Sequence, residues 1–351
     1  MIAKTLDNLI HTKHPTAQEG DKVFTSLDKL SSPEGCTHFI AKASTSKVYR
    51  VCRDTSPCGK CLAVKIPIND NSLDSKEADV GIQLTAAFKG TCAEVHFNKI
   101  RAIVPSSHGP LIISQYEEQV SGFSKVSDLL QQRKISKQLW KSINFQFIKA
   151  IYCAQLAVPW FSHNDTHTEN VMLVPNDTNH TCIVTSPKGI QLAHHSNVIL
   201  KIIDFGQVLA KDPRLQTDEG QQWKDRGLWG NKMLDYHRFL VWAIDDLFFY
   251  NDSKEPDWYK EWLDFVLRFF TDRMIPDKFN PKDKYYLDKR EFFHVTKTGP
   301  SVKYIPTPLG SVYLQKYYGP RTSKSIGDML DDDYFQEYRV DKISFTNEVT
   351  K

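Results

Sequence analysis

Polar side chains are concentrated in the stretch FSHNDTHTENVML, residues 161–173. It carries two histidines, an aspartate, a glutamate and two asparagines between apolar flanks. A polar group buried without a partner costs roughly 1–3 kcal/mol, so core segments do not normally accumulate so many of them. Either the stretch is a loop exposed to solvent, or its polar side chains take part in a reaction or in binding. In the second case Asp165, His167 and Asn170 are the candidates, in the spacing H-x-D-x-H-x-x-N.

Two other segments could supply groups to the same chemistry. KIIDFGQ, residues 201–207, is a buried-looking strand that ends in Asp204, and LAVKI, residues 62–66, places Lys65 after three apolar residues. Two acids and an amide at strand ends suit Mg²⁺ bound to phosphates, because this ion prefers hard oxygen ligands and keeps waters and phosphate oxygens. With a lysine for the phosphates and a carboxylate to orient an attacking hydroxyl, the set predicts a phosphoryl-transfer site.

The first third of the chain has the pattern of a small sheet. Residues 1–35 are polar and are expected to form a loosely ordered or helical extension. Short runs rich in β-branched and aromatic residues then predict strands, and residues 74–89 predict one helix. The strand candidates are THFIAKAS, KVYRVCR, CLAVKIPI, VHFNKIRAIV and PLIISQY, all within about 36–116.

The rest of the chain has a helical pattern. In 137–157 the residues Trp140, Ile143 and Phe147 recur at intervals of three and four, which predicts a helix with one buried face. Aromatic-rich helical patterns dominate from about 231 onward. The predicted fold class is therefore α+β, with a small β-rich lobe followed by a larger helical lobe. The expected parts are an extension (1–35), the β-rich lobe (36–118) and the helical lobe (119–351).

Three motifs together resemble the protein-kinase superfamily. AVKI, HNDTHTEN and DFG occur in the order of that family's V-A-I-K, H-R-D-x-x-x-x-N and D-F-G motifs. The resemblance covers roughly residues 36–250 and implies a bilobal, protein-kinase-like fold. Loops reading H-N-D-x-H are familiar from Ser/Thr protein kinases of large DNA viruses. Aminoglycoside and choline kinases use a related H-x-D-x-H-x-x-N, but the intact D-F-G makes the viral comparison closer.

The resemblance implies a role for each of these residues. Asp165 matches the catalytic aspartate that accepts the proton of the substrate hydroxyl. Asn170 and Asp204 match the Mg²⁺ ligands, and Lys65 matches the lysine that holds the α- and β-phosphates of ATP. His167 would lie near the γ-phosphate, where the family usually has lysine. It would add a sensitivity to pH, because the unperturbed pKa of histidine is about 6.5.

The resemblance also implies a set of nucleotide contacts, with departures from the family pattern. The implied residues are Ala43, Ser44, Thr45, Ser46 and Val48 in the phosphate-covering loop, Ala63 in the strand of Lys65, and Gln115, Tyr116 and Glu117 at the adenine hinge. The loop contains no glycine, the residue that lets a backbone approach phosphates closely. It therefore predicts weaker nucleotide binding or a more distant loop.

The acid that pairs with Lys65 has two candidates. Glu77 and Asp79 are two residues apart and therefore lie on different faces of the predicted helix. Asp79 fits the family pattern of an acid before alternating apolar residues better, whereas Glu77 has the longer side chain. Both remain open from the sequence.

Three other features are expected to be structural. Asp235 resembles the acid that braces the catalytic loop, and His163 either takes part in the chemistry or is a packed histidine that props this loop. The stretch 175–197 is expected to protrude as a β-hairpin or loose loop, with His194 and His195 as a solvated pair.

Composition limits the partners and the compartment. A net charge of +3, with lysine and arginine spread along the chain, gives no argument for nucleic acid or an anionic membrane. The most apolar run, 239–250, is short and contains two aspartates, so no transmembrane segment is expected. No secretory signal is visible, which predicts reduced cytoplasmic thiols for the seven cysteines. A hairpin turn explains Cys58 and Cys61 better than a zinc site.

The leading hypothesis is an enzyme: an ATP- and Mg²⁺-dependent Ser/Thr protein kinase of viral type that acts on protein hydroxyls, in the host cytoplasm or the virion. One alternative is a small-molecule kinase of the aminoglycoside or choline type, favoured by His167 and by the absence of an A-P-E motif. The other is a pseudokinase that serves as a binding or virion structural module, favoured by the glycine-free loop.

Overall fold

The structure is a computed structural model. It describes residues 2–12, 14–29, 37–42, 46–52, 61–69, 75–116, 125–176, 181–225, 232–248, 256–270, 286–287, 293–298, 301–306 and 324–341. All structural statements below concern these residues.

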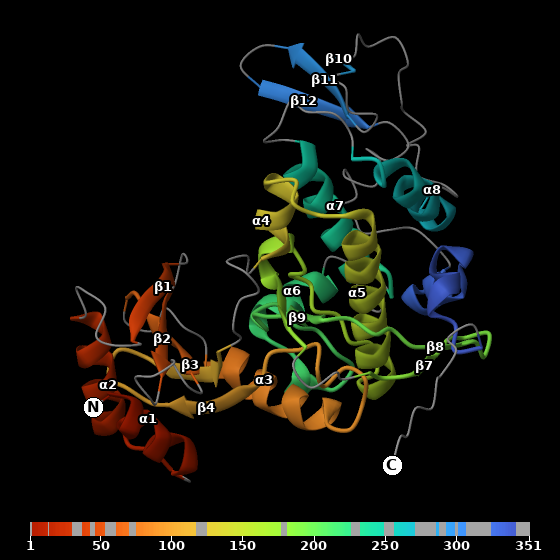
Figure 1. Cartoon of the computed structure of the whole chain (residues 1–351). Coiled ribbons are helices and arrows are strands. Elements are labelled where there is room, and N and C mark those ends of the chain that lie inside the picture. The colour runs from red at the N-terminus through yellow and green to blue at the C-terminus, as the bar shows by residue number, and fades with distance from the viewer. Residues whose placement is uncertain are drawn as a thin grey trace.

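A five-stranded antiparallel sheet forms the core of the first lobe (Figure 1). Its order is β1-β2-β3-β5-β4, with β1 His38–Lys42, β2 Ser46–Cys52, β3 Cys61–Pro67, β4 Ile100–Val104 and β5 Leu111–Gln115. In the central strand β3, Val64 and Ile66 are fully buried, while Ala63 and Lys65 on the opposite face are half-buried. The two faces of the sheet therefore have different environments, as the alternation of side chains along a strand requires.

Two N-terminal helices cover the apolar face of this sheet. Helix α1 (Ile2–His11) and helix α2 (Ala17–Asp28) bury Leu6, Leu9, Val23 and Leu27 in one cluster with sheet residues such as Val64. A capping box between Thr16 and Glu19 fixes the start of α2. The expected extension is thus helical, and it contributes to the core of the sheet lobe.

Helix α3 (Ser75–Phe88) belongs to the core of the second lobe as much as to the sheet. Its residues Val80, Leu84 and Phe88 are buried in the large cluster that contains the helical lobe. Gly81 lies against Ile100 of β4 and Phe205, because a Cβ at this position would be 2.6 and 3.0 Å from their side chains. Helix α3 therefore contacts both lobes.

The second lobe is mainly helical. It contains α4 (Val126–Gln131), α5 (Lys137–Ala157), α6 (Asp218–Asp225), α7 (Leu234–Phe248) and α8 (Tyr259–Phe270). Helix α5 is buried along most of its length, and its Trp140 and Phe147 stack on Phe239 of α7. The predicted α+β architecture, with a β-rich first lobe and a helical second lobe, is confirmed (Figure 1).

Short strands connect the parts of the second lobe. β6 (Val171–Pro175) pairs with β9 (Val198–Ile202), and β7 (Val184–Thr185) with β8 (Gln191–Leu192). The strands β10 (Tyr286–Leu287), β11 (Phe293–Thr298) and β12 (Ser301–Pro306) form a separate antiparallel sheet. Two 3-10 segments pack on α5: Ile326–Asp331, and Asp333–Tyr338 through the rings of Phe335 and Tyr338 against Phe145.

The insertion between β6 and β9 is covered by the chain's last described segment. Ala193 N donates to Tyr338 O at 2.8 Å, and Val340 N donates to Gln191 O at 2.9 Å. The ring of His194 packs between Phe145 and Tyr338, and its burial lowers its pKa to about 4. The predicted hairpin is therefore present, but the prediction of a solvated His194 is wrong, because the C-terminal segment covers it.

Among the described residues, four cysteines form disulfides, which corrects the expectation of reduced thiols. Cys52 pairs with Cys61 across the β2–β3 ladder, and Cys92 pairs with Cys182, 90 residues further along the chain. Cys153 is free and buried. Cys58 lies outside the described residues, and Cys61 is already in a disulfide.

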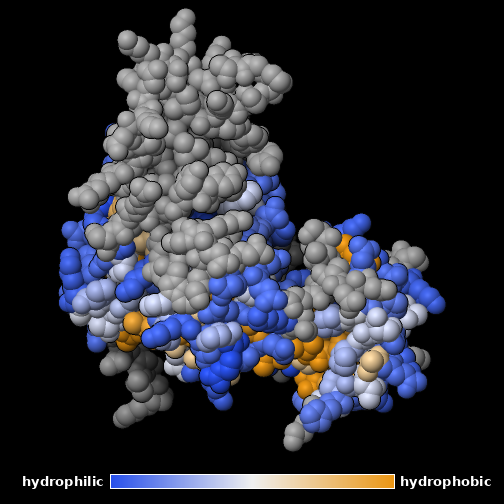
Figure 2. All heavy atoms as spheres, turned by 180° about the vertical axis from the view of Figure 1, so that it is seen from behind, coloured by the Kyte–Doolittle hydropathy of each residue, from blue (hydrophilic) through white to orange (hydrophobic). Residues whose placement is uncertain are grey.

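On the face shown in Figure 2, most of the coloured residues are hydrophilic, and a group of hydrophobic residues is exposed in the lower part of the view. Large apolar side chains are exposed at Phe39, Ile40, Ile82, Leu156, Trp160, Ile183 and Trp242. Within the described residues no helix has the length and apolar character needed to cross a membrane.

Candidate active site

The polar stretch at 161–170 is a loop that helix α7 holds in place. The buried carboxylate of Asp235 accepts hydrogen bonds from the backbone N–H groups of His163 at 2.9 Å and Asn164 at 2.8 Å. Thr166 Oγ1 donates to the backbone oxygen of Asp235 at 2.6 Å. Burial raises the pKa of Asp235, against the hydrogen bonds that favour its charged form. Asp235 thus has the bracing position that the sequence predicted.

The same loop is joined to the segment that follows Asp204. Asn164 Nδ2 donates to Gln207 O at 3.0 Å, and its Oδ1 accepts from Ser162 Oγ at 2.8 Å. Ser162 and Leu209 exchange two backbone hydrogen bonds of 2.8 and 2.9 Å. Asn164 adopts a positive φ of 60°, a conformation that asparagine tolerates better than most residues. The positions of the two segments are therefore coupled.

Asp165, which is partly exposed, forms a direct pair with the buried Asn170. Asn170 Nδ2 donates to Asp165 O at 2.9 Å and to Asp165 Oδ2 at 3.0 Å. His167 Nε2 lies 3.6 Å from Asp165 Oδ2, and both side chains are about a quarter exposed, at 25% and 26%. The carboxylate of Asp165 is therefore oriented by an amide and still accessible to an acceptor from solvent.

Trp242 lies beside this pair, and no sequence motif pointed to it. Its ring on α7 lies 5.6 Å from the ring of His167, and the residue is 37% exposed. Trp242 is seven residues, about two helical turns, after Asp235, so both lie on the same face of α7. That spacing is the signal by which the sequence could have located it.

Lys65 pairs with Glu77, which decides between the two candidate acids. Lys65 Nζ lies 3.0 and 3.2 Å from the carboxylate oxygens of Glu77, and 3.7 Å from Asp204 Oδ2. Asp79 is exposed, whereas Ala78 and Val80 on either side of it are buried. The prediction that placed Asp79 in the nucleotide site is corrected, because this side chain lies on the solvent face of α3.

Strand pairing explains why Asn170 and Asp204 lie together. β6 and β9 are antiparallel with Val171 opposite Ile202, so the residue before β6 and the residues after β9 lie at the same end. Ile203 N donates to Asn170 O at 3.0 Å. A chain of contacts therefore joins the two lobes. It runs from Lys65 to Asp204, from the neighbouring Ile203 to Asn170, and from Asn170 to Asp165.

The backbone at Asp204 has an unusual conformation. Its φ is +69°, and Gly206 N donates to Asp204 Oδ1 at 3.2 Å. Positive φ is uncommon for residues other than glycine, and such positions cluster at functional sites. The turn directs the carboxylate back toward Lys65 instead of continuing strand β9.

Lys65, Glu77 and Asp204 each alter the pKa of the other two. Burial and the charge of Asp204 raise the pKa of Glu77 to about 7. Burial opposes ionisation of Asp204 as well, but Lys65 and the Gly206 hydrogen bond hold the pKa of Asp204 below its usual value. Burial alone would lower the pKa of Lys65. The negative charges of Asp204 and Glu77 have the larger effect, so the pKa of Lys65 is raised above its usual value. The cluster has more carboxylate than ammonium groups and therefore favours an added cation.

The donor set is compatible with Mg²⁺ bound together with phosphates. Asp204 offers a carboxylate, and because Asn170 Nδ2 is committed to Asp165, its amide oxygen is the atom left for a cation. Across the described residues, no three His, Cys, Asp or Glu side chains are arranged to hold a metal ion without other ligands. Two protein ligands are sufficient for Mg²⁺ only when phosphate and water supply the others.

The sheet supplies a half-buried face above this cluster. Val48 lies opposite Lys65 in the β2–β3 ladder, and Ala63 lies opposite Ser114 in the β3–β5 ladder. Ala63 and Lys65 are two residues apart and share a face, which places all four side chains on the side of the sheet away from α1 and α2. Ser46 is buried, with no hydrogen-bond partner for its Oγ among the described residues. Ala43, Ser44 and Thr45 lie outside the described residues.

Two N–H groups of the predicted adenine hinge are already engaged within the protein, which limits this part of the prediction to the carbonyl groups. Gln115 N donates to Lys99 O at 2.9 Å, and Tyr116 N donates to Cys61 O at 3.3 Å. Neither N–H can therefore also donate to a base, because the chain is still engaged in the sheet at these positions. Glu117, the remaining predicted contact, lies outside the described residues. The guanidinium of Arg50 stacks 4.8 Å from the ring centroid of Tyr116.

His163 is a packed histidine. It is fully buried, its ring lies 5.8 Å from that of Phe205 and 6.5 Å from that of Phe97, and neither ring nitrogen has a hydrogen-bond partner among the described residues. Burial lowers the pKa of His163, so the ring is neutral at pH 7. Of the two hypotheses for His163, the structure favours the one in which it props the loop.

Comparisons with known proteins return solved structures alone. No protein-family model matches the chain, and no curated protein matches it in sequence. Among the similar structures is the BubR1 kinase domain, at 12% identity and a TM-score of 0.44, with 92% of each chain covered. Another is the kinase domain of PF14_0431, at 14% identity and a TM-score of 0.38. In that case the match covers 52% of this chain and about half, 55%, of the other. Identities this low say nothing about activity.

Proposed function

We propose that this protein is an ATP- and Mg²⁺-dependent phosphotransferase that transfers the γ-phosphoryl group of ATP to Ser or Thr hydroxyls of proteins. The observation that carries the proposal is the chain of contacts from Glu77 through Lys65 to Asp204, together with the partly exposed carboxylate of Asp165 that Asn170 orients. The H-N-D-x-H loop supports the viral type of Ser/Thr kinase, and a location in host cytoplasm or virion follows from that type.

The chemistry assigns a task to each group. The acceptor hydroxyl donates its proton to the carboxylate of Asp165 while its oxygen forms a bond to the γ-phosphorus, and the bond from that phosphorus to the β-γ bridging oxygen breaks to release ADP. Lys65, held by Glu77, neutralises charge on the α- and β-phosphates. Mg²⁺, when bound by Asp204 and the Asn170 oxygen, would supply further positive charge to the phosphates. Trp242 and His167 border the acceptor.

The direct test is a radiolabelled-ATP assay of the wild type beside Lys65→Met and Asp204→Asn. Each variant removes a charge that the proposal places on the phosphates or the metal, so each is expected to lose transfer by at least 100-fold. Generic basic proteins and a panel of amino alcohols serve as parallel acceptors. Transfer to the amino alcohols alone would make the protein a small-molecule kinase.

Glu77→Gln and Asp79→Asn form a matched pair on helix α3. Glu77→Gln removes the buried charge that holds Lys65, so we expect KM for ATP to rise about 10-fold. Asp79→Asn changes an exposed side chain, so KM for ATP is expected to stay within a factor of two. Steady-state kinetics at saturating acceptor measure both. A rise in KM for ATP in the Asp79 variant alone would reverse the assignment.

A binding measurement separates an enzyme from a pseudokinase scaffold. A ligand that binds the folded state raises its thermal stability, so Mg-ATP is expected to increase the Tm of the wild type. An increase without detectable transfer to any acceptor would support a nucleotide-binding scaffold, and no increase at millimolar ATP would contradict nucleotide binding altogether.

A further inference from the structure

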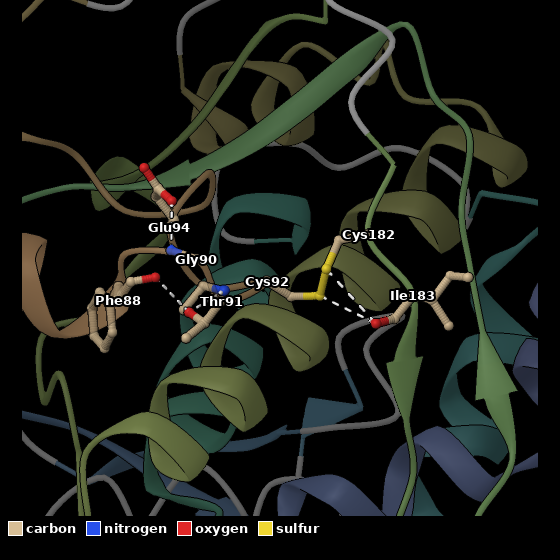
Figure 3. The surroundings of a disulfide bond; sticks show 8 residues. Phe88, Gly90, Thr91, Cys92, Glu94, Cys182 and Ile183 are labelled. Carbon is tan, nitrogen blue, oxygen red and sulfur yellow. Dashed lines mark hydrogen bonds between the residues drawn. A yellow bond between two sulfur atoms is a disulfide. The ribbon is translucent and has the colours of Figure 1, made fainter.

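The residues after helix α3 form a fixed connection to Cys92 (Figure 3). Gly90, two residues after the last residue of α3, has a φ of +76°, a conformation that suits glycine. Its backbone N–H donates to Glu94 Oε2 at 2.8 Å, and Thr91 Oγ1 donates to Phe88 O at 2.7 Å. A displacement of Cys92 is therefore transmitted to the end of α3.

Cys182, the partner of Cys92, lies in the insertion between β6 and β9, and this insertion is anchored to the helical lobe. Ser186 Oγ, two residues after Val184, donates to the carboxylate of Asp331 in the C-terminal segment. Asp331 in turn lies in a 3-10 segment that packs on α5. The disulfide thus links one end of α3 to a fixed part of the second lobe.

The other end of α3 carries the acid of the candidate active site. Glu77 lies in the first turn of this 14-residue helix, and it is the residue that contacts Lys65. A helix of this length moves largely as a rigid body, so its attachment at Cys92 influences where Glu77 lies relative to Lys65. The β1–β5 sheet makes no comparable covalent link with the second lobe within the described residues, since Cys52–Cys61 lies inside the sheet.

The local structure can accommodate a reduced form as well. Cys92 Sγ lies 3.3 Å from Ile183 O, close enough for a thiol at position 92 to donate to that carbonyl. Cys92 is 9% exposed, whereas Cys182 is half-buried and therefore more accessible to a reagent from solvent. In the reduced form the two sulfurs must separate to non-bonded distance, and the carbonyl of Ile183 offers the Cys92 thiol an acceptor in its present position.

We propose that Cys92 and Cys182 form a reversible redox switch that fixes helix α3 in the position where Glu77 holds Lys65. The oxidant class is a small-molecule disulfide such as oxidised glutathione. The Cys182 thiolate attacks one of its sulfurs and releases one glutathione thiolate, and the Cys92 thiolate then displaces the second. The two protein thiols lose two protons and two electrons, and the oxidant becomes two thiols. The effect on nucleotide binding rests on the proposed function.

The first measurement concerns the bond and the helix and needs no activity. The full-length protein is equilibrated with oxidised glutathione or with a reducing agent, and unreduced peptide mapping looks for a linked pair of peptides that contain Cys92 and Cys182. Hydrogen exchange then follows residues 75–88. We expect the linked pair only after oxidation, and at least 10-fold slower exchange in α3 in the oxidised form. Absence of the linked pair, or equal exchange in both forms, would overturn the switch.

The second measurement connects the switch to the site. Mg-ATP affinity of the wild type is expected to be about 3- to 10-fold higher in the oxidised form. Cys182→Ser should have the lower affinity under both conditions, and Cys52→Ser/Cys61→Ser, which removes the disulfide inside the sheet, should keep the redox response. Slower exchange in α3 without ATP binding in either form would refute the proposed function and leave the switch intact. Equal affinities in both forms would refute the link to the site. The two forms of the wild type decide these outcomes even where a serine variant fails to fold.

Discussion

Asp165→Asn is expected to lower the rate of phosphoryl transfer by about 10²–10⁴-fold, the range typical for loss of a general acid–base group. The asparagine side chain has nearly the same shape and can still contact Asn170, but it cannot accept the proton of the acceptor hydroxyl. Because Lys65, Glu77 and Asp204 are unchanged, Mg-ATP should bind as in the wild type. Initial rates with radiolabelled ATP measure the first effect, and the increase in Tm on addition of Mg-ATP measures the second.

The matched control for this experiment is Asp257→Asn. Asp257 is an exposed aspartate just before helix α8, remote in sequence from every segment of the site. Its substitution removes one negative charge from the surface, and we expect transfer to stay within a factor of two of the wild type. An unchanged rate in Asp165→Asn would remove this carboxylate from the mechanism. Loss of both transfer and ATP binding would assign Asp165 a role in holding the loop.

The convergence of Asn170 and Asp204 was predictable because local rules determine it. Asn170 directly precedes the short apolar strand β6, and Asp204 comes two residues after the end of the apolar strand β9. Antiparallel pairing brings the start of one strand beside the end of the other, so the two residues lie close together. The family pattern left Glu77 and Asp79 open, but the spacing of the helix contains a signal that favours Glu77. Glu77, Gly81, Leu84 and Phe88 follow one another at intervals of four, three and four, which is the spacing of a buried helix face.

Features that depend on distant partners could not be predicted in the same way. Nothing local indicates that Cys92 lies beside Cys182, or that Tyr338 covers His194, because both contacts arise only after α5, the insertion and the C-terminal segment have packed together. The N-terminal helices are an intermediate case. Leu6 and Leu9 have helical spacing, and Val23 and Leu27 do too, but the sheet face that they cover is formed by residues between Tyr49 and Ile113.

Lys149→Met is expected to stabilise the protein by about 1–3 kcal/mol at pH 7. Lys149 on α5 is 4% exposed, and it has no ion pair with an acidic side chain among the described residues. Burial lowers its pKa from 10.5 to about 8, so at pH 7 the folded state holds a buried ammonium group. A difference of 2.5 pKa units corresponds to at most about 3 kcal/mol, of which the nearby ring of Phe145 already offsets a part. Methionine has a similar length and no charge to desolvate.

The pH dependence gives this prediction a distinctive sign. Between pH 8 and pH 10.5 the unfolded wild type binds more protons at Lys149 than the folded wild type, so this group makes wild-type stability rise with pH in that window. The methionine variant lacks this group, and its advantage over the wild type is therefore expected to shrink from pH 7 to pH 10. Urea unfolding of both proteins at the two pH values measures the difference, in which the other titrating groups cancel.

Lys260→Met is the control for Lys149→Met, since Lys260 is an exposed lysine on α8. Its substitution should change the free energy of unfolding by no more than about 0.5 kcal/mol at either pH. A destabilised Lys149→Met variant would mean that the buried ammonium group has an anionic or carbonyl partner that holds it in the fold. A stabilisation that stays constant from pH 7 to pH 10 would mean that the gain comes from apolar packing on α5, and that the amine of Lys149 keeps an ordinary proton affinity in the folded state.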